Sequence, residues 1–380
     1  MDFGYTDEQR QLQETLLRYI AKEYGFAERR KLARSDLGYS PGHWQAFADL
    51  GVLALTIPEA QGGLDGNAID TMIVMEALGR GLVLEPYLST AVICGGLIAD
   101  AGSEAQKASL LPAIGGGELV MALAHYEPGA RYELNHVAAT ARADGGGYVL
   151  DGVKTVVIAG SQAHRLIVSA RTSGDARDDA GVSLFIVDRD AAVIGIRGYP
   201  TQDGARAAEI TLTGVRLAAD ALLGAAGRAM PVIERAIERG IAALCAEAVG
   251  VMSALNDATL EYLKTREQFG GPIGRFQALQ HRMVDMFIAA EQARSMAIMA
   301  GVGVGSNDAA ERHRTVSMAK ALVGQSARFV GQQAVQLHGG MGVTDELIVS
   351  HYFKRLTVIN TTFGDADHHL GRVSDLLLAT

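Results

Sequence analysis

An arginine, a phenylalanine and a glutamine lie close together in residues 262–281, where one amphipathic segment ends and another begins. Arg266 and Phe269 come before the run Gly270-Gly271-Pro272, and Gln277 follows it. Glycine frees the backbone and proline removes an amide donor, so this run predicts a break between two helices. A guanidinium at such a turn can bind two oxygens of a pyrophosphate at once. The structural alternative is a helical hairpin whose arginine is a solvated surface charge.

Long helices are predicted on either side of this break. Apolar residues recur every three or four positions from Ile233 to Tyr262 and from Leu279 to Ala293, which is the spacing of one helix face. A third helix is predicted over 316–330, and it ends with a glycine cap at 337–340. Long antiparallel helices joined by short turns form a bundle. The glycine-rich residues 301–308 are expected to be a flexible loop.

The first two thirds of the sequence contain a helical segment followed by a β-rich segment. The first third has helical spacing, with a capping box at Thr6 and Gln9 and another helix start at Ser40-Pro41. From Val120 to about Gly224 the chain alternates and turns often. The breaks at 145–147 and Asp151-Gly152 predict hairpins there.

These patterns predict an α+β multidomain chain, because 380 residues are too many for one core. The expected parts are an all-α N-terminal domain at 1–119, a middle β-barrel domain at 120–228 and a C-terminal four-helix bundle at 229–380.

Composition and charge exclude several function classes. The net charge is −9 and no basic stripe is present, which argues against a nucleic-acid groove. Cys94 and Cys245 lie in apolar surroundings, so free buried thiols and a reducing cytoplasm are expected. The first residues are polar and acidic, unlike a secretory signal. No uninterrupted apolar run reaches the roughly 18 residues of a membrane span.

Two runs in the C-terminal third carry a resemblance to a known family. R-x-x-F-G-x-P-I and the following F-Q-A-L-Q-H resemble the C-terminal signature of the acyl-CoA dehydrogenases, and the resemblance extends over nearly the whole chain. In that family the matching side chains help to hold FAD, partly that of a neighbouring subunit. The resemblance therefore implies FAD-binding roles for Arg266, Phe269 and Gln277.

A second motif, A-V-Q-L-H-G-G, lies at the predicted end of the third helix. It is similar to the family motif that contacts the adenosine part of FAD across a subunit interface, which implies roles for Gln336, Gly339 and Gly340. The glycines would let the backbone approach the ligand closely. The structural alternative is a helix cap with a surface glutamine.

The segments that hold the flavin ring in the family depart from its pattern here. Tyr126 stands where a threonine normally bonds the ring, and Arg131 and Tyr132 replace a Gly-Ser pair that contacts flavin and substrate. Ile158 stands at another common threonine position, and isoleucine offers no hydrogen bond. Glu127 is expected either to orient this loop or to be a carboxylate at its rim.

The catalytic base is also missing from its usual place. The family reaction removes a proton α to the thioester while hydride leaves the β-carbon for the flavin, and the proton requires a carboxylate. Phe363 falls on the glutamate of the family's Tyr-Glu-Gly-Thr turn. The candidate substitutes are Asp365, Asp367 and Glu238, and Glu238 lies close to Gly240, where some relatives place the base. A helix N-cap and a helix-surface glutamate are the respective structural alternatives.

Two other polar patterns are discounted. The run Asp365-x-Asp367-His368-His369 has no further ligands nearby in the sequence, so no metal site is predicted. Ser317-x-x-Lys320 matches a serine-acylase motif but lies in an apolar helix without a companion motif.

The runs A-H-Y-E-P-G-A-R-Y and F-G-D-A-D-H-H resemble most closely the small-subunit type associated with pimeloyl-CoA, and subunits of two-component bacterial dehydrogenases for steroid side chains. This resemblance implies an acyl-CoA substrate and an electron-transferring flavoprotein as acceptor. It also implies a homotetramer, or a heterotetramer with a second acyl-CoA dehydrogenase-like subunit. Three hypotheses follow: one subunit of a dehydrogenase that forms trans-2-enoyl-CoA, a homo-oligomer with an unusual base, or a non-catalytic subunit that supports an active partner.

Overall fold

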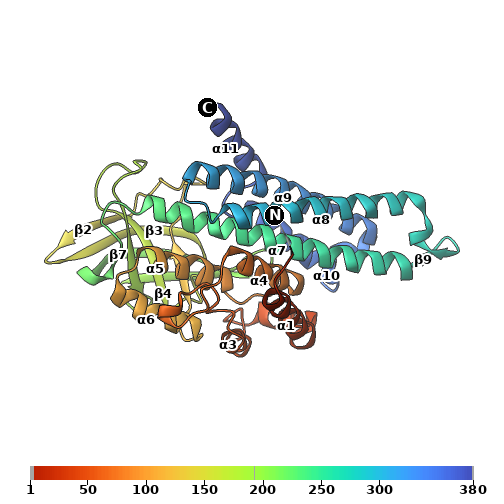
Figure 1. Ribbon diagram of the computed structural model, residues 1–380, viewed down its shortest axis with the longest axis horizontal. Coiled ribbons are helices and arrows are strands. Elements are labelled where there is room, and N and C mark those ends of the chain that lie inside the picture. The colour runs from red at the N-terminus through yellow and green to blue at the C-terminus, as the bar shows by residue number, and fades with distance from the viewer. Residues whose placement is uncertain (1–3, 192, 379–380) are drawn as a thin grey trace. The chain divides into compact units, whose positions relative to one another are not determined.

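The computed structural model describes residues 4–191 and 193–378, which form two compact units (Figure 1). The helical unit comprises residues 4–30, 68–83 and 241–378, and the sheet unit comprises residues 31–67 and 84–240. Each unit therefore combines segments that are far apart in the sequence. The predicted helical and β regions are confirmed, whereas the domain boundaries at 119/120 and 228/229 stay predictions.

Long helices form the bundle predicted for the C-terminal third (Figure 1). Helix α9 contacts α8, α10 and α11, and Asn256 of α7 donates a hydrogen bond to the Met286 carbonyl of α8 at 3.4 Å. The bundle helices are α7 (Met230–Thr265, which belongs to this unit from Ile241 onward), α8 (Gln277–Gly303), α9 (Ala309–His338) and α10 (Ile348–Thr361). The unit also contains α1 (Asp7–Glu23), the start of α2 (Phe26–Arg34), α4 (Ala68–Gly81), strands β9 (Glu267–Gln268) and β10 (Gly271–Pro272), the short helices η4 (Ile273–Arg275) and η5 (Gly339–Val343), and α11 (Ala366–Leu378).

Side-chain and glycine caps determine where these helices begin and end. The capping box at Thr6 and Gln9 is confirmed at the start of α1. Asp308 begins α9, because its carboxylate accepts the Ala310 N–H at 2.9 Å. Gly339 ends α9 with φ at 59°, a conformation that glycine adopts without a steric penalty.

The expectation of a flexible loop over 301–308 is wrong for its first three residues. Helix α8 continues to Gly303, and Gly301 is buried within it. A β-carbon on Gly301 would lie 3.2 Å from the Ile69 side chain of α4. Glycine is therefore used here for close helix packing, and composition alone does not distinguish that use from a loop.

Two further glycines let α4 and α7 approach closely. A β-carbon on Gly250 would lie 2.0 Å from the Glu76 carbonyl oxygen, and one on Gly79 would lie 2.2 Å from the Glu247 carbonyl oxygen. Both distances are shorter than real side chains reach, so these positions require glycine. This contact joins residues 68–83 to the bundle.

The middle of the chain forms an eight-stranded mixed sheet in the order β6-β7-β3-β2-β4-β5-β8, with β1 paired in parallel to β4. The glycine turn at Gly145-Gly146 joins β2 and β3 as predicted. The predicted hairpin at Asp151-Gly152 is wrong, because this pair is a bulge inside β3, where the register against β7 shifts. The strands are β1 (Met121–Ala124), β2 (Thr140–Asp144), β3 (Gly147–Ile158), β4 (Arg165–Arg171), β5 (Val182–Asp188), β6 (Ile194–Pro200), β7 (Arg206–Ala218) and β8 (Leu222–Leu223).

Helices of the sheet unit are tied to the sheet and to each other by polar side chains. The hydroxyls of Ser89 and Thr90 donate to the Met121 carbonyl of β1 at 3.0 and 3.1 Å. Arg239 in the first part of α7 forms a two-bond ion pair with Asp100 at 2.7 and 3.0 Å. The helices are α3 (Pro41–Asp49), η1 (Glu59–Gln61), the π-helix η2 (Leu88–Cys94), α5 (Gly95–Ala101), α6 (Glu104–Gly115) and η3 (Ala219–Ala221).

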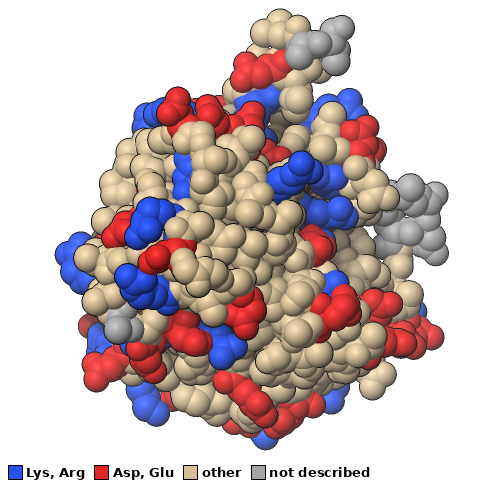
Figure 2. All heavy atoms as spheres, turned by 90° about the vertical axis from the view of Figure 1, so that its left-hand side faces the viewer, with Lys and Arg blue, Asp and Glu red and all other residues tan. Residues whose placement is uncertain are grey.

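Within the described residues, α7 is the one helix long and apolar enough to cross a membrane. Its most apolar window has a mean hydropathy of 1.3, but 78% of that window is buried inside the protein, so α7 is a core helix. Acidic and basic side chains are interspersed over the face shown in Figure 2 rather than gathered by sign.

Candidate functional site

The residues of the C-terminal signature lie at the turn between α7 and α8, as predicted. Arg266 follows α7, Phe269 lies in the tight turn between β9 and β10, and Gln277 is the first residue of α8. All three are exposed, and Phe269 is 84% exposed with φ at 54°. Arg275 holds the turn by donating to the Phe269 carbonyl at 2.7 Å. The turn therefore presents its polar groups outward on a fixed backbone.

A stacked pair of rings brings the second motif close to the end of α7. The Tyr262 ring stacks on the His338 imidazole, with centroids 4.3 Å apart and planes 27° apart. The Tyr262 hydroxyl also donates to the His338 carbonyl at 3.4 Å. His338 is the last residue of α9, and Gln336, Gly339 and Gly340 surround it. Sequence reasoning missed Tyr262, although it marks the end of the apolar stripe of α7.

This end of the bundle has the features that a pyrophosphate and an adenosine require. The guanidinium of Arg266 makes no hydrogen bond or ion pair with any residue in the described part of the chain. A β-carbon on Gly339 or Gly340 would meet no heavy atom within 4 Å, so a ligand can approach their backbone. The guanidinium of Arg266 and the accessible peptide groups at Gly339 and Gly340 are suited to an anionic dinucleotide.

The residues implied for the flavin-ring side lie in the sheet unit, in the loop after β1 and at the end of β3. The Tyr126 carbonyl accepts the Thr155 N–H at 2.8 Å, which ties the loop to β3. Tyr126 and Ile158 are partly buried, whereas Arg131 is exposed. The loop is therefore anchored at its start and exposed further along.

Glu127 is only 5% exposed, so the alternative of a rim carboxylate is wrong. One of its oxygens accepts the Ala138 N–H at 2.7 Å, and the other accepts the Ala139 N–H at 3.0 Å and the Lys154 Nζ at 2.6 Å. Glu127 thus binds both the end of the loop and β3, and it orients the segment between residues 128 and 137.

Lys154 is the centre of a buried polar cluster, the Lys154 cluster, made by His125, Glu127, Lys154 and Ser169. Its ammonium also donates to the His125 carbonyl at 3.2 Å and to the Ser169 hydroxyl at 2.9 Å. Burial lowers the pKa of Lys154 to about 8, against the opposing effect of Glu127. Burial and the Lys154 charge lower the pKa of His125 to about 3, so this imidazole is neutral and bonds Ser169 Oγ at 2.9 Å. A lysine among the valines of β3 was a local sign of a buried charge, but it did not identify the partners of that charge.

The candidate bases have different surroundings. Asp365 caps α11, because its Oδ1 accepts the His368 N–H at 2.9 Å. Glu238 lies in α7 within the sheet unit and is 3% exposed, so it is not a surface glutamate. Phe363 lies between α10 and α11 with φ at 59° and offers no proton acceptor. The roles of Glu238 and Asp365 stay predictions.

A second buried lysine holds the turn that carries Phe363. Lys320 of α9 is 1% exposed and donates to the carbonyls of Asn360 at 2.9 Å and Gly364 at 2.6 Å. Burial lowers the pKa of Lys320 to about 8. Lysine at this position therefore satisfies the carbonyls at the end of α10 and fixes the turn that follows.

His369 fixes the same turn from α11. Burial lowers its pKa to about 3, so the ring is neutral and has one donor and one acceptor nitrogen. Its Nε2 lies 3.0 Å from the Phe363 carbonyl, which requires a donor, and its Nδ1 then accepts from the Ser317 hydroxyl at 3.2 Å. Ser317 and Lys320 are thus parts of a structural clamp, the Lys320 clamp, together with His369.

Backbone strain is concentrated in the same segments. Eight described residues other than glycine have positive φ, from 49° to 68°. Such conformations cost about 1–3 kcal/mol and persist only where the surroundings impose them. Five of the eight lie in segments that the family resemblance singles out: Arg131, Val156, Ala159, Phe269 and Phe363.

The described residues contain neither a metal-ligand group nor a reactive cysteine. No group of three His, Cys, Asp or Glu residues in 4–191 and 193–378 is placed to hold a metal ion. Cys94 and Cys245 are free and buried, as predicted. Burial raises the pKa of Cys245 to about 12, which makes it a poor nucleophile.

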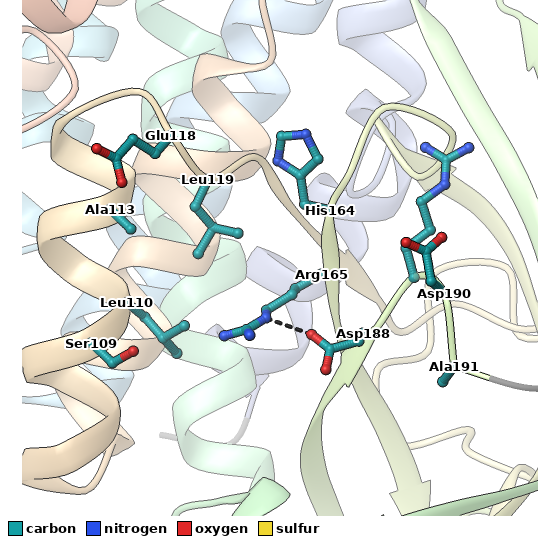
Figure 3. A pocket seen from close by; sticks show the side chains of 11 residues that line it. Ser109, Leu110, Ala113, Glu118, Leu119, His164, Arg165, Asp188, Asp190 and Ala191 are labelled. Atoms are coloured by element: carbon teal, nitrogen blue, oxygen red, sulfur yellow. Dashed lines mark hydrogen bonds and ion pairs between the residues drawn. The ribbon is translucent and has the colours of Figure 1, made fainter.

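A polar pocket of about 720 Å³ lies in the sheet unit between α6 and the ends of β4 and β5 (Figure 3). Arg165 of β4 pairs with Asp188 of the neighbouring strand β5 at 2.6 Å, and His164 Nδ1 accepts the Val120 N–H at 3.1 Å. None of the residues predicted from the sequence lines this pocket.

Three family profiles match consecutive parts of the chain. The acyl-CoA dehydrogenase N-terminal domain matches residues 6–118, the middle domain residues 122–215 and the C-terminal domain residues 227–378. Acyl-CoA dehydrogenase fadE12 of Mycobacterium tuberculosis is 31% identical over 310 residues, which cover 80% of this chain and 79% of that protein.

Two more relatives agree with this assignment. Mitochondrial isovaleryl-CoA dehydrogenase of Pongo abelii is 28% identical over 366 residues, which cover 92% of this chain and 84% of that protein. The solved structure of a Tcur3481-Tcur3483 steroid ACAD variant is 28% identical with a TM-score of 0.88, and the match covers 98% of both chains. The chain therefore belongs to the acyl-CoA dehydrogenase family, whose members are FAD-dependent oxidoreductases.

Proposed function

We propose that this chain is one subunit of an acyl-CoA dehydrogenase that oxidises an acyl-CoA thioester to the trans-2-enoyl-CoA. An electron-transferring flavoprotein is the proposed acceptor, and the cytoplasm is the proposed compartment. The proposal rests on one observation: the residues proposed to bind FAD are present, whereas the usual catalytic base is missing. Arg266, Gly339 and Gly340 are free to bind the adenosine and pyrophosphate part of FAD, whereas the position of the family base holds Phe363.

The chain's own residues have distinct parts in this reaction. Arg266 binds pyrophosphate oxygens, and the exposed peptide groups at Gly339 and Gly340 let the adenosine approach. Phe269 and Gln277 add contacts from the α7–α8 turn. When FAD is bound it accepts the hydride that leaves the β-carbon of the thioester.

The α-proton requires a carboxylate that the Phe363 turn does not supply. Asp365 also caps α11 through its Oδ1, and the candidate bases are buried Glu238, Asp365 and a carboxylate of an unlike partner chain. The similar structure is named for Tcur3481 together with Tcur3483 and as a steroid ACAD. Its name supports both an unlike partner and a bulky acyl group as the substrate.

The visible spectrum and solution mass of the chain purified alone test the proposal. We expect a flavin-poor, weakly active protein, and recovery of flavin and activity when a second dehydrogenase-like chain is co-expressed. One flavin per chain with rapid turnover from a homotetramer would instead favour an unusual base within this chain. Glu238→Gln and Asp365→Asn would then identify it, since loss of the base should lower the rate at least 100-fold.

A second candidate function, a non-catalytic supporting subunit, is favoured by the same Phe363 observation. Arg266→Ala in the two-chain complex separates the two. Loss of flavin from the complex supports a direct part in cofactor binding, whereas full flavin occupancy at an unchanged rate supports the supporting role. Arg314→Ala, which removes another exposed arginine of the helical unit, is the matched control.

A further inference from the structure

The loop between β1 and β2 carries one cation that the protein does not neutralise. Arg131 is exposed, and its guanidinium makes no hydrogen bond or ion pair with the residues in 4–191 and 193–378. The two carboxylates of the loop are both paired, Glu127 with Lys154 and Glu133 with Arg177. Arg131 is therefore left as an available positive charge.

The backbone at Arg131 is strained. Its φ is 49°, a left-handed conformation that residues with a β-carbon adopt uncommonly and glycine adopts freely. Gly129 shows this, since it takes φ of 84° in the same loop. Glycine would fit position 131 without strain, so an arginine there indicates a use for its side chain.

Buried charges hold both ends of the loop in place. Glu127 and Lys154 fix its start, as described above. Arg171, which is 6% exposed, fixes its end by donating to the carbonyls of Val137 at 2.9 Å and Asn135 at 3.0 Å. The same guanidinium also donates to three carbonyls of residues 176–180. Because the loop is ordered in advance, a ligand of Arg131 does not have to order it.

We propose that Arg131 binds an oxyanion of the acyl-CoA and so determines which thioesters the chain accepts. This inference rests on the proposed function. A guanidinium binds a carboxylate or a phosphate through two parallel hydrogen bonds. An acyl-CoA offers such a group either in the phosphates of its CoA or in a second carboxylate at the far end of a dicarboxylic acyl chain.

Anaerobic calorimetric titration of the assembled enzyme, with its flavin reduced beforehand so that no hydride can be transferred from the thioester, tests the inference. The probes are octanoyl-CoA, which has only the CoA phosphates, and suberoyl-CoA, which adds a terminal carboxylate. We expect Arg131→Gln to weaken binding about 10- to 100-fold, the range of one hydrogen bond to a charged group. Arg131→Lys should retain part of the affinity. Arg142→Gln, which removes an exposed arginine of β2, should leave both affinities unchanged.

The pattern of losses identifies the source of the oxyanion. Equal losses for both thioesters support a CoA phosphate, and a loss confined to suberoyl-CoA supports the terminal carboxylate. Unchanged affinities in Arg131→Gln overturn the inference and leave the proposed function intact. A wild-type enzyme that binds neither thioester overturns both.

Arg131→Gly separates ligand binding from a structural role. Glycine relieves the strained backbone, so the melting temperature should stay the same or rise while the affinity is lost. A lower melting temperature in Arg131→Gly would show that the side chain supports the fold, and would overturn the inference.

Discussion

Two buried lysines each hold a loop in place, and they are satisfied in different ways. In the sheet unit, Lys154 meets a carboxylate, Glu127, at 2.6 Å. In the helical unit, Lys320 donates to the carbonyl oxygens of Asn360 and Gly364, and the charge of Asp365 also favours its ammonium form. Burial lowers the pKa of each lysine to about 8. The first loop therefore depends on its lysine through an ion pair, and the second depends on its lysine through hydrogen bonds to the backbone.

The difference lies in what is left when the lysine is removed. Without Lys154, the Glu127 carboxylate would be a buried, uncompensated charge, and such losses cost about 3–5 kcal/mol. Without Lys320, the buried Gly364 carbonyl would lose its donor, which costs about 1–3 kcal/mol, whereas the Asn360 bond is only partly buried and its loss costs less. The loop at 128–137 should thus depend more strongly on its lysine than the turn at 362–364.

The largest effect is expected for Lys154→Met, which should lower the free energy of unfolding by about 3–5 kcal/mol in urea titration. The double variant Glu127→Gln, Lys154→Met should recover part of this loss, because it removes the buried charge. Lys264→Met, at an exposed surface pair with Glu261, is the control and should change stability by less than about 0.5 kcal/mol. A double variant no more stable than Lys154→Met would show that packing, and not charge, dominates.

Lys320→Met should lower the free energy of unfolding by about 1–3 kcal/mol, less than Lys154→Met. Urea titration under the same conditions measures both. If Lys320→Met lowered the free energy of unfolding as much as Lys154→Met does, the expected difference between the two lysines would be wrong, because carbonyl partners would then matter as much as a carboxylate.

Sequence patterns predicted the helices, the capping box and the turn at 270–272, because those signals are local. The two lysine sites could not be predicted in this way. Glu127 lies 27 residues before Lys154, and the His369 partner of Ser317 lies 52 residues away, so only the fold brings these groups together. The Ser317-x-x-Lys320 spacing even suggested unrelated chemistry.

The errors have a physical cause as well. Glycine at Asp151-Gly152 and at Gly301 indicates an unusual backbone or a close contact without saying which. The chain reverses at a hairpin and continues at a bulge, and the strand that pairs alongside decides between them. In the same way, the neighbouring helix α4 decides that Gly301 lies in a packed helix and not in a loop. The Arg266 turn was predicted well, since its consequence, exposure at a helix break, is local.

The pH dependence of stability tests the burial of Lys320. Burial lowers the pKa of Lys320 to about 8 in the folded chain, against about 10.4 when unfolded, so the unfolded state binds more protons between these pH values. The free energy of unfolding should therefore rise with pH in this window, by at most about 1.4 kcal/mol between pH 8 and 9 from this group. Urea midpoints at both pH values should show a smaller rise in Lys320→Met than in the wild type. An unchanged rise would mean that Lys320 keeps its proton.

The smallest effect concerns the strain next to Lys154. Val156 lies in the second bulge of β3, is 53% exposed and has φ of 49°, a genuine outlier for a β-branched residue. Val156→Gly should raise the free energy of unfolding by up to about 1 kcal/mol, because relief of strain outweighs the added freedom of the unfolded chain.

Val153→Gly is the matched control. This valine is 41% exposed on the same strand, is paired with Thr211 and does not have a positive φ. There glycine should destabilise by about 0.5–1 kcal/mol. Opposite signs for two valines on one strand would show that the Lys154 cluster maintains a strained backbone, whereas equal losses would show that Val156 is an ordinary strand residue.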